Sequence, residues 1–332
     1  FIIYYIDNKM AKTKKRIKSP RKRQRSQQKP MQTPDTPLTF HCNRSKLLSD
    51  ILKERGFIQI DCRSHRPSDI SLWDPYKTCE IQSRVRCIDR KVLNPLDNKR
   101  DMYLKLQKMG RTPFLPPTFP YASQLSSTDL DPSKLYFLKM IHGAGGKDVH
   151  PVKTLRDIRK IVSGSLENYI VQEEVPNMML HDGCKTTMRM YVCIADGRVY
   201  MYDDGYVYLY KVKYDRERLD LNIHNDIFNV RYEPFSQQPY YDEVLPKLRS
   251  ICKQTVTPFL RGPKKDRFRI LGIDFILDES LKPYLIEVNS YPNLNYDGCI
   301  VVKKQMVYDF VTMYVLPKLQ KTPIKRGGWT LC

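Results

Sequence analysis

Long apolar runs are absent from this sequence. No stretch of the 332 residues approaches the ~20 consecutive apolar residues that a membrane-spanning helix needs. The apolar start, Phe1 to Ile6, is too short for a secretory signal and lacks the basic segment that precedes one. We therefore expect a soluble, intracellular and cytoplasmic protein without a membrane partner, and we place its first translated residue at Met10.

Cysteine pairing motifs are also missing. The nine cysteines are odd in number and scattered, none forms a Cys-x-x-Cys pair, and no Cys/His cluster has the spacing of a zinc site. This usage predicts reduced, mostly buried thiols in an intracellular protein. It argues against a structural zinc.

Acidic residues are missing from one part of the chain. Residues 12–29 contain ten Lys and Arg and no Asp or Glu, so the rest keeps +11 of the formal net charge of +21. Ser, Pro and Gln lie between these charges, which favours disorder because little apolar surface can be buried. The stretch is either an arm for nuclear localisation or for binding a polyanion such as nucleic acid, or a solvated tail. The remaining positive excess favours an acidic partner.

What remains has the composition of a folded protein. The chain is 41% hydrophobic and 11% aromatic, which excludes a wholly disordered protein, and its length allows two or three domains. A Pro-rich segment over 112–120 predicts a domain boundary. The expected divisions are a disordered basic tail and linker over 1–37, a small N-terminal α/β domain over 38–107, a central lobe over 108–180, a C-terminal lobe over 181–320 and a tail over 321–332.

Periodicity predicts both helices and strands. Helical spacing predicts helices over 46–52, 99–106, 154–163 and 301–316. Apolar or alternating runs predict strands over 57–60, 136–140, 169–172, 270–277 and 283–288. Residues 187–214 alternate and predict antiparallel strands joined at Asp196-Gly197 and Asp204-Gly205. The expected fold class is α+β with a mixed or antiparallel sheet core.

A glycine-rich segment follows the strand predicted over 136–140. Residues 143–147 read Gly-Ala-Gly-Gly-Lys, but this is not a Walker A motif because Ile141 occupies the place of its first Gly and Asp148 follows the Lys. Such a loop can still cover phosphates, with backbone N–H groups as donors and the lysine as a point charge. The alternative is a flexible hairpin turn.

Three polar residues interrupt two apolar strands near the end of the chain. Glu287 and Asn289 are two residues apart and therefore point to one face of a strand, and Asp274 meets that face if the turn over 278–280 pairs the strands. Hard oxygen donors in apolar surroundings are costly unless a cation satisfies them. Magnesium prefers carboxylate, amide and phosphate oxygens. We favour a magnesium site here over a pair of surface carboxylates.

These residues, in this order, resemble the ATP-grasp ligases and more narrowly the tubulin–tyrosine ligase-like family. The resemblance covers roughly residues 40–318, and weaker outer matches include Lys99 before a helix and the segment 115–119. It implies a small N-terminal α/β domain and two ATP-binding lobes. The motifs that carry it are Lys139, the glycine loop, Gln172-Glu173-Glu174-Val175, Lys185-x-x-x-Arg189, Gly272-x-Asp274-Phe275 and Glu287-Val288-Asn289-x-x-Pro292.

The resemblance also implies a role for each matching residue. Lys139 would contact ATP phosphates, and Lys185 and Arg189 match the first and last residues of the family's Lys-Phe-Asp-x-Arg motif, so they would supply catalytic cations. The remaining assignments are Gly145, Gly146 and Lys147 in a mobile loop, Gln172, Glu173, Glu174 and Val175 in a hinge that binds adenine through its backbone, Asn222 at the ATP site, and Asp274, Glu287 and Asn289 as magnesium ligands.

The reaction that the resemblance implies joins a carboxylate to an amine. ATP first converts the carboxylate to an acyl phosphate, and the amine of an amino acid such as tyrosine, glutamate or glycine then attacks it. The acceptor would be a protein with an acidic tail, of which tubulin is one candidate. Cations and magnesium suit this chemistry because charge spreads over the transferring phosphoryl group.

The chain departs from the family pattern at three positions. Thr187 replaces the Asp of Lys-Phe-Asp-x-Arg, Tyr208 stands where the family has an Arg for the incoming amino acid, and Leu219 replaces the His of His-Leu-Thr-Asn. Two other interpretations stay open. One is a catalytically silent binding protein that keeps the fold, and the other is an ATP-grasp ligase for a small molecule.

Overall fold

The computed structural model describes most of the chain after residue 35. The described residues are 36–41, 45–61, 66–72, 83–143, 148–217, 230–260, 262 and 265–332. The helices and strands of these described residues all belong to one compact unit, Pro37–Cys332. The predicted boundaries at 107 and 180 fall inside this unit and stay predictions. No helix among these residues is long and apolar enough to cross a membrane.

The larger of two sheets is built around two long antiparallel strands. Its strands are β1 (Thr39–His41), β2 (Ile58–Gln59), β3 (Ser68–Ser71), β4 (Ser83–Cys87), β9 (Leu180–His181), β10 (Cys184–Ala195), β11 (Arg198–Tyr202), β12 (Tyr206–Lys213), β13 (Val230–Pro234), β14 (Arg267–Leu277), β15 (Pro283–Asn289) and β16 (Trp329–Leu331). β10 pairs with β14 from Met188↔Phe275 to Ala195↔Phe268, and β4, β3, β1 and β2 extend the sheet in parallel. The sheet is therefore mixed.

The smaller sheet is antiparallel and has the order β5-β8-β6-β7. Its strands are β5 (Thr118–Phe119), β6 (Tyr136–Met140), β7 (Val149–Val152) and β8 (Tyr169–Glu173). Leu138 and Val171 point to one face, where they pack with Ile158 of helix α4 (Leu155–Ile161). A capping box between Thr154 and Asp157 begins this helix.

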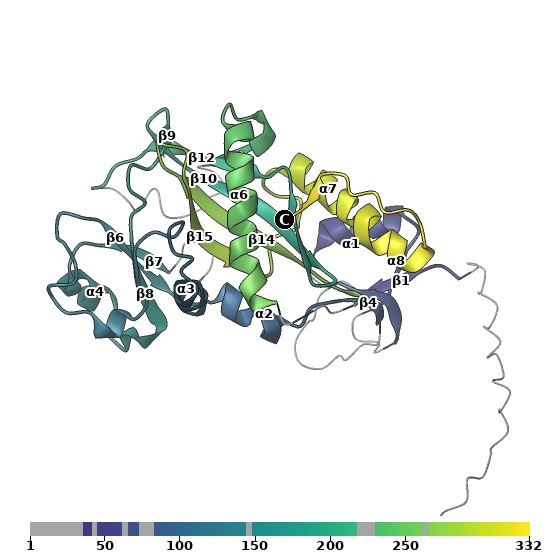
Figure 1. The fold of residues 1–332 in the computed structure, drawn as a ribbon, viewed down its shortest axis with the longest axis horizontal. Coiled ribbons are helices and arrows are strands. Elements are labelled where there is room, and N and C mark those ends of the chain that lie inside the picture. Colours follow the sequence, from purple (N-terminus) through teal and green to yellow (C-terminus); the bar gives the residue numbers. More distant parts are fainter. Residues whose placement is uncertain are drawn as a thin grey trace, which may run out of the picture. The chain divides into compact units, whose positions relative to one another are not determined.

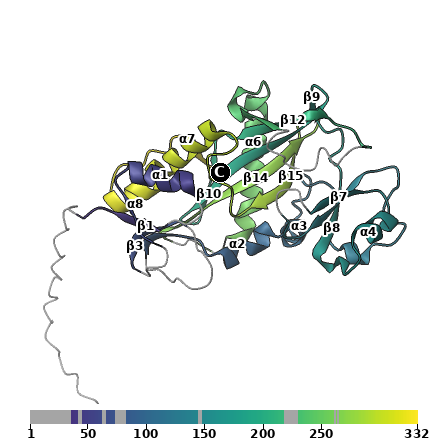
Figure 2. The ribbon, with the colours of Figure 1, turned by 180° about the vertical axis from the view of Figure 1, so that it is seen from behind.

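Helices cover both faces of the larger sheet. Alternate residues of β10 point into two different cores, Tyr191 and Cys193 into one and Val192 and Ile194 into the other. Helix α6 crosses one face, and α1, α7 and α8 lie together on the other (Figure 1, and from behind in Figure 2). The helices, besides α4, are α1 (Lys46–Glu54), α2 (Arg90–Asp97), α3 (Lys99–Lys108), α6 (Tyr241–Val256), α7 (Ile300–Phe310) and α8 (Leu316–Gln320).

The α+β class with mixed and antiparallel sheets is confirmed, and so are the helices and strands predicted from periodicity. The helix expected over 301–316 is α7, a π-helical turn over Val311–Val315, and α8. The last residues differ from the expected tail. Trp329 is 1% exposed, and β16 pairs with β11 at the sheet. Burying a tryptophan there explains why this short segment is ordered.

Candidate functional site

A pocket lies between the two sheets. Its walls come from β6 and β8 of the smaller sheet and from β10, β12, β14 and β15 of the larger one, together with Lys99 at the start of α3. Val175, Met178 and Ile286 line the pocket and belong to one apolar cluster, which we call the apolar end. Lysines and carboxylates also line the pocket, and we call this group the charged end. The pocket thus offers both an apolar surface and charged groups.

Lysines concentrate at the charged end. Lys99 and Lys139 are each 7% exposed, and Lys185 also lines the pocket. Burial lowers the pKa of Lys139 to about 7, helped by the nearby charges of Lys99 and Lys185 and opposed by Glu287. Burial also lowers the pKa of Lys185 to about 8, opposed by Glu174. Burial therefore disfavours the charged forms of Lys139 and Lys185, and a bound anion would favour them again.

The three predicted metal ligands lie together, as the strand pairing required. Asp274 of β14 is opposite Glu287 of β15, at a bulge in the pairing. The Asn289 amide nitrogen donates to Asp274 Oδ2 and to Glu287 Oε1, both at 3.1 Å. Burial raises the pKa of Asp274 to about 6 although Arg189 opposes this. Burial has the same effect on Glu287, but the charge of Lys99 and other contacts outweigh it and lower the pKa.

Arg189 and Lys99 balance these two carboxylates. Arg189 donates through Nε to Asp274 Oδ1 and through Nη2 to Oδ2, the second bond at 2.8 Å. Gly272 makes room for this side chain, because a Cβ there would lie 3.0 Å from Arg189 Nη1. The Nζ of Lys99 lies 3.3 Å from Glu287 Oε2 and donates to the carbonyl of Gly143 at 2.6 Å. The sequence pointed to Lys99 only through a weak motif match, because its partners are far away in the chain.

The donor set fits magnesium. The two carboxylates lie together in a buried pocket and are hard oxygen ligands of the kind magnesium prefers. The Asn289 amide touches both through its nitrogen, so it would have to turn its oxygen toward a metal to serve as a ligand. In the part of the chain that the structure describes, no three His, Cys, Asp or Glu side chains are placed to hold a metal ion. A cation here would therefore depend on the Asn289 amide and on a ligand's own oxygens as well as on the two carboxylates.

The segment predicted as an adenine hinge ends β8. Glu173 and Glu174 line the pocket, but their backbone N–H groups already donate to Pro117 O at 2.8 Å and Leu135 O at 2.9 Å. The Glu174 carboxylate accepts from Tyr214 and from Arg216, which ties the end of β12 to the hinge. An adenine base bound beside this segment would therefore have to form hydrogen bonds with groups other than these two N–H groups.

Two of the three departures from the family pattern lie side by side. Thr187 on β10 is opposite Tyr208 on β12, and both line the pocket. The ring of Tyr208 lies 5.1 Å from that of Tyr206 and 5.2 Å from that of Tyr232. The Tyr208 hydroxyl donates to that of Tyr206 at 3.3 Å. Burial raises the pKa of Tyr208, so this hydroxyl stays neutral.

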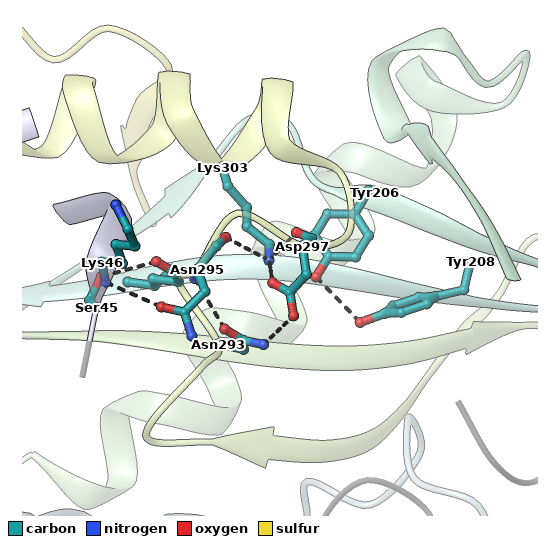
Figure 3. Close-up of polar contacts among 9 residues, drawn as sticks. Ser45, Lys46, Tyr206, Tyr208, Asn293, Asn295, Asp297 and Lys303 are labelled. Carbon is teal, nitrogen blue, oxygen red and sulfur yellow. Dashed lines mark hydrogen bonds and ion pairs between the residues drawn. The ribbon is translucent and has the colours of Figure 1, made fainter. Parts of the chain in front are cut away.

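Residues of the loop after Asn289 lie near these tyrosines (Figure 3). In Figure 3, Tyr206 lies between Tyr208 and Asp297. Lys303 of α7 is 2% exposed and donates to the Asp297 carboxylate at 2.9 Å and to its carbonyl at 2.6 Å. Asn293 also donates to Asp297, at 2.6 Å. This buried lysine therefore fastens the loop to α7.

The structure brings most of the predicted site residues together. Lys139, Gln172 to Val175, Lys185, Asp274 and Glu287 line the pocket, and Arg189 and Asn289 touch Asp274. Gly145, Gly146, Lys147, Asn222 and Leu219 lie outside the described residues. The functional roles of all these residues stay predictions.

Fold and site together define an α+β protein with a charged pocket between two sheets. The model of the "Tubulin-tyrosine ligase family" matches residues 86–246 and 236–323. The chain belongs to this family.

Curated relatives include tubulin-modifying proteins. The mouse "Probable tubulin polyglutamylase TTLL2" is 23% identical over 91% of this chain and 66% of its own length. The human "Tubulin polyglutamylase TTLL13" is 25% identical over 58% of this chain and 29% of its own. "Tubulin glycylase 3B" of Tetrahymena thermophila is 24% identical over 56% of this chain and 19% of its own. The chain thus spans 19–66% of the length of these relatives.

Proposed function

We propose that this chain is an ATP- and magnesium-dependent carboxylate–amine ligase that adds an amino acid to a protein. The observation that supports this most is the charged end of the pocket, where Lys99, Lys139 and Lys185 all line one pocket. Three lysines in one pocket, two of them with pKa values lowered by burial, suit a polyphosphate. The apolar end suits a flat base, and both ends belong to the same pocket.

In this proposal the acceptor carboxylate is activated before the amine attacks. A carboxylate oxygen bonds to the terminal phosphorus of ATP, ADP leaves with its electron pair, and an acyl phosphate forms. The amine nitrogen then bonds to the acyl carbon, inorganic phosphate leaves, and the surplus proton passes to solvent. Lys139, Lys185 and Arg189 neutralise charge on the phosphoryl oxygens. Asp274, Glu287 and Asn289 would hold magnesium, which adds positive charge at those oxygens.

The identities of the acceptor protein and of the added amino acid are argued from the relatives and from two residues of the pocket. Names of the relatives point to tubulin, whose acidic tail is the protein substrate that we propose. Tyr208 and Thr187 place neutral hydroxyls at the pocket wall where the family resemblance led us to expect an Arg and an Asp. Selection of the amino acid then depends on neutral groups more than the family pattern implies.

Incubation of the chain with magnesium-ATP, purified tubulin and labelled tyrosine, glutamate or glycine in separate reactions tests the proposal. We expect one label to enter tubulin, only when both ATP and magnesium are present. A thermal shift that needs both ATP and magnesium should accompany this. The absence of a thermal shift at saturating nucleotide would favour the catalytically silent binding protein. Release of phosphate from ATP without labelling of a protein would favour the ligase for a small molecule.

A further inference from the structure

A line of buried polar side chains crosses three strands of the smaller sheet. Thr118 on β5 is opposite Gln172 on β8. The direct partner of Gln172 on β6 is Phe137, and Lys139 lies two positions further along β6. Thr118, Lys139 and Gln172 are 9%, 7% and 6% exposed. Lys139 and Gln172 line the pocket, whereas Thr118 stands behind Gln172.

The hydrogen bonds in this line have one consistent direction. The Thr118 hydroxyl donates its only proton to the carbonyl of Pro116 at 2.8 Å. It can therefore only accept from Gln172, whose Nε2 lies 3.0 Å away. This fixes the amide orientation, because Oε1 must then point the other way. The Lys139 ammonium donates to that oxygen at 2.6 Å.

A neutral acceptor holds the ammonium without cancelling its charge. Lys99 is paired with Glu287, and Arg189 with Asp274, so part of the charge on those cations is already balanced. Lys139 is held by an amide oxygen, which offers a strong charge-assisted hydrogen bond but no negative charge. When Lys139 is in its ammonium form, its charge therefore remains for an anion in the pocket. Charged groups that act on it are Lys99, Lys185 and Glu287.

We propose that Gln172 is a positioning residue, which Thr118 locks in one amide orientation so that Gln172 directs the Lys139 ammonium toward a phosphate group of the nucleotide. The inference rests on the proposed function for the identity of that anion. It gives the Gln172 side chain a task different from base recognition, because both of its polar atoms already have partners.

Substitutions at Thr118 separate this role from simple packing. Thr118→Val keeps the shape but removes the acceptor for Gln172 Nε2, so the amide is free to turn and to present a donor to the ammonium. We expect magnesium-ATP affinity, measured by calorimetry, to fall on the order of tenfold. Thr118→Ser keeps the hydroxyl and should restore wild-type affinity. Thr128→Val, which removes an exposed hydroxyl bonded to Ser126, is the matched control and should change nothing.

A second measurement needs no nucleotide. The rate at which acetic anhydride acylates Lys139, followed by mass spectrometry, reports how firmly the ammonium is held. Acylation should be faster in Thr118→Val and in Gln172→Leu than in the wild type or in Thr118→Ser, because the lost acceptor favours the neutral amine. Equal rates in all four proteins would overturn the inference. Failure of the wild type to bind magnesium-ATP would defeat the proposed function, and the acylation rates would still decide the role of Gln172.

Discussion

Two lysines of the pocket have pKa values near neutrality. Burial lowers the pKa of Lys139 to about 7 and that of Lys185 to about 8, and the charge of Lys99 lowers that of Lys139 further. A buried ammonium is disfavoured until an opposite charge arrives. When no anion is bound, these two lysines therefore lose their protons as the pH rises through 7 and 8. A bound phosphate would keep them protonated over the same pH range.

We accordingly expect nucleotide binding to take up protons. Bound phosphates favour the ammonium forms and raise both pKa values. The affinity for the nucleotide is therefore highest below pH 7 and declines as the pH rises through 7 and 8. Calorimetry in two buffers with different ionisation enthalpies measures the uptake. Affinity that stays constant across this range would show that neither lysine meets the phosphates.

The two carboxylates should matter far more to turnover than to folding. Glu287→Gln and Asp274→Asn each remove one charge from the proposed magnesium ligands and keep the shape. We expect ligation to fall by more than about a hundredfold, since even outer partners of a metal site cost 10–100-fold. Initial rates at saturating ATP, over a range of magnesium concentrations, provide the measurement.

Glu243→Gln is the control for this pair, because it removes an exposed carboxylate of α6 that is paired with Lys247. It should leave the rate unchanged. Thermal unfolding of all three variants checks that the fold survives. Near wild-type ligation by either Asp274→Asn or Glu287→Gln would mean that the metal is held elsewhere.

At the scale of elements, local patterns predicted the hairpin that carries the site. Two apolar strands joined by the turn over 278–280 pair as β14 and β15, and Asp274 meets Glu287 as the pattern required. The alternation over 187–214 likewise became β10, β11 and β12. These features depend on side-chain period and turn residues, which are local properties of the sequence.

Contacts between distant segments were not predictable in the same way. Lys99 meets Glu287, and Thr118 supports Gln172, across 188 and 54 residues of sequence. Neither Lys nor Thr carries a local signal for such a partner. The strand β16 was missed because three residues are too few to show a period, and tertiary burial of Trp329 decides its structure.

The C-terminal strand should contribute substantially to stability. The Trp329 ring packs edge-on against Tyr202 at 5.2 Å, and its Nε1 donates to Met306 O at 3.2 Å. Trp329→Ala should lower the free energy of unfolding by about 3–5 kcal/mol, measured by urea denaturation. Leu331→Ala, in the same strand but 43% exposed, should change it by less than about 0.5 kcal/mol. Equal effects would show that β16 is held by its backbone pairing alone.

At the scale of the whole chain, positive charge has two separate sources. Ten Lys and Arg lie in residues 12–29, and +11 remains on the rest. The proposed site residues all lie in the second part, so the two contributions can be separated by truncation. Charge acts over roughly a Debye length, ~8 Å at physiological salt, and mainly speeds encounter with an oppositely charged partner.

A chain lacking residues 1–31 should therefore keep its chemistry and lose part of its attraction for acidic proteins. We expect ligation to a free acidic peptide to persist, because no proposed catalytic residue lies in the deleted segment, while the KM for intact tubulin rises.

For both chains, the KM for the acidic peptide should rise with salt, and a neutral peptide of equal length should be a poorer and less salt-sensitive acceptor. Kinetics with both peptides and tubulin at low and high salt distinguish the cases. Complete loss of ligation on the free peptide would make the basic segment part of the active site. Equal KM values for acidic and neutral peptides at low salt would exclude an acidic acceptor. The net charge of +11 outside the basic segment would then not help to bind the protein substrate.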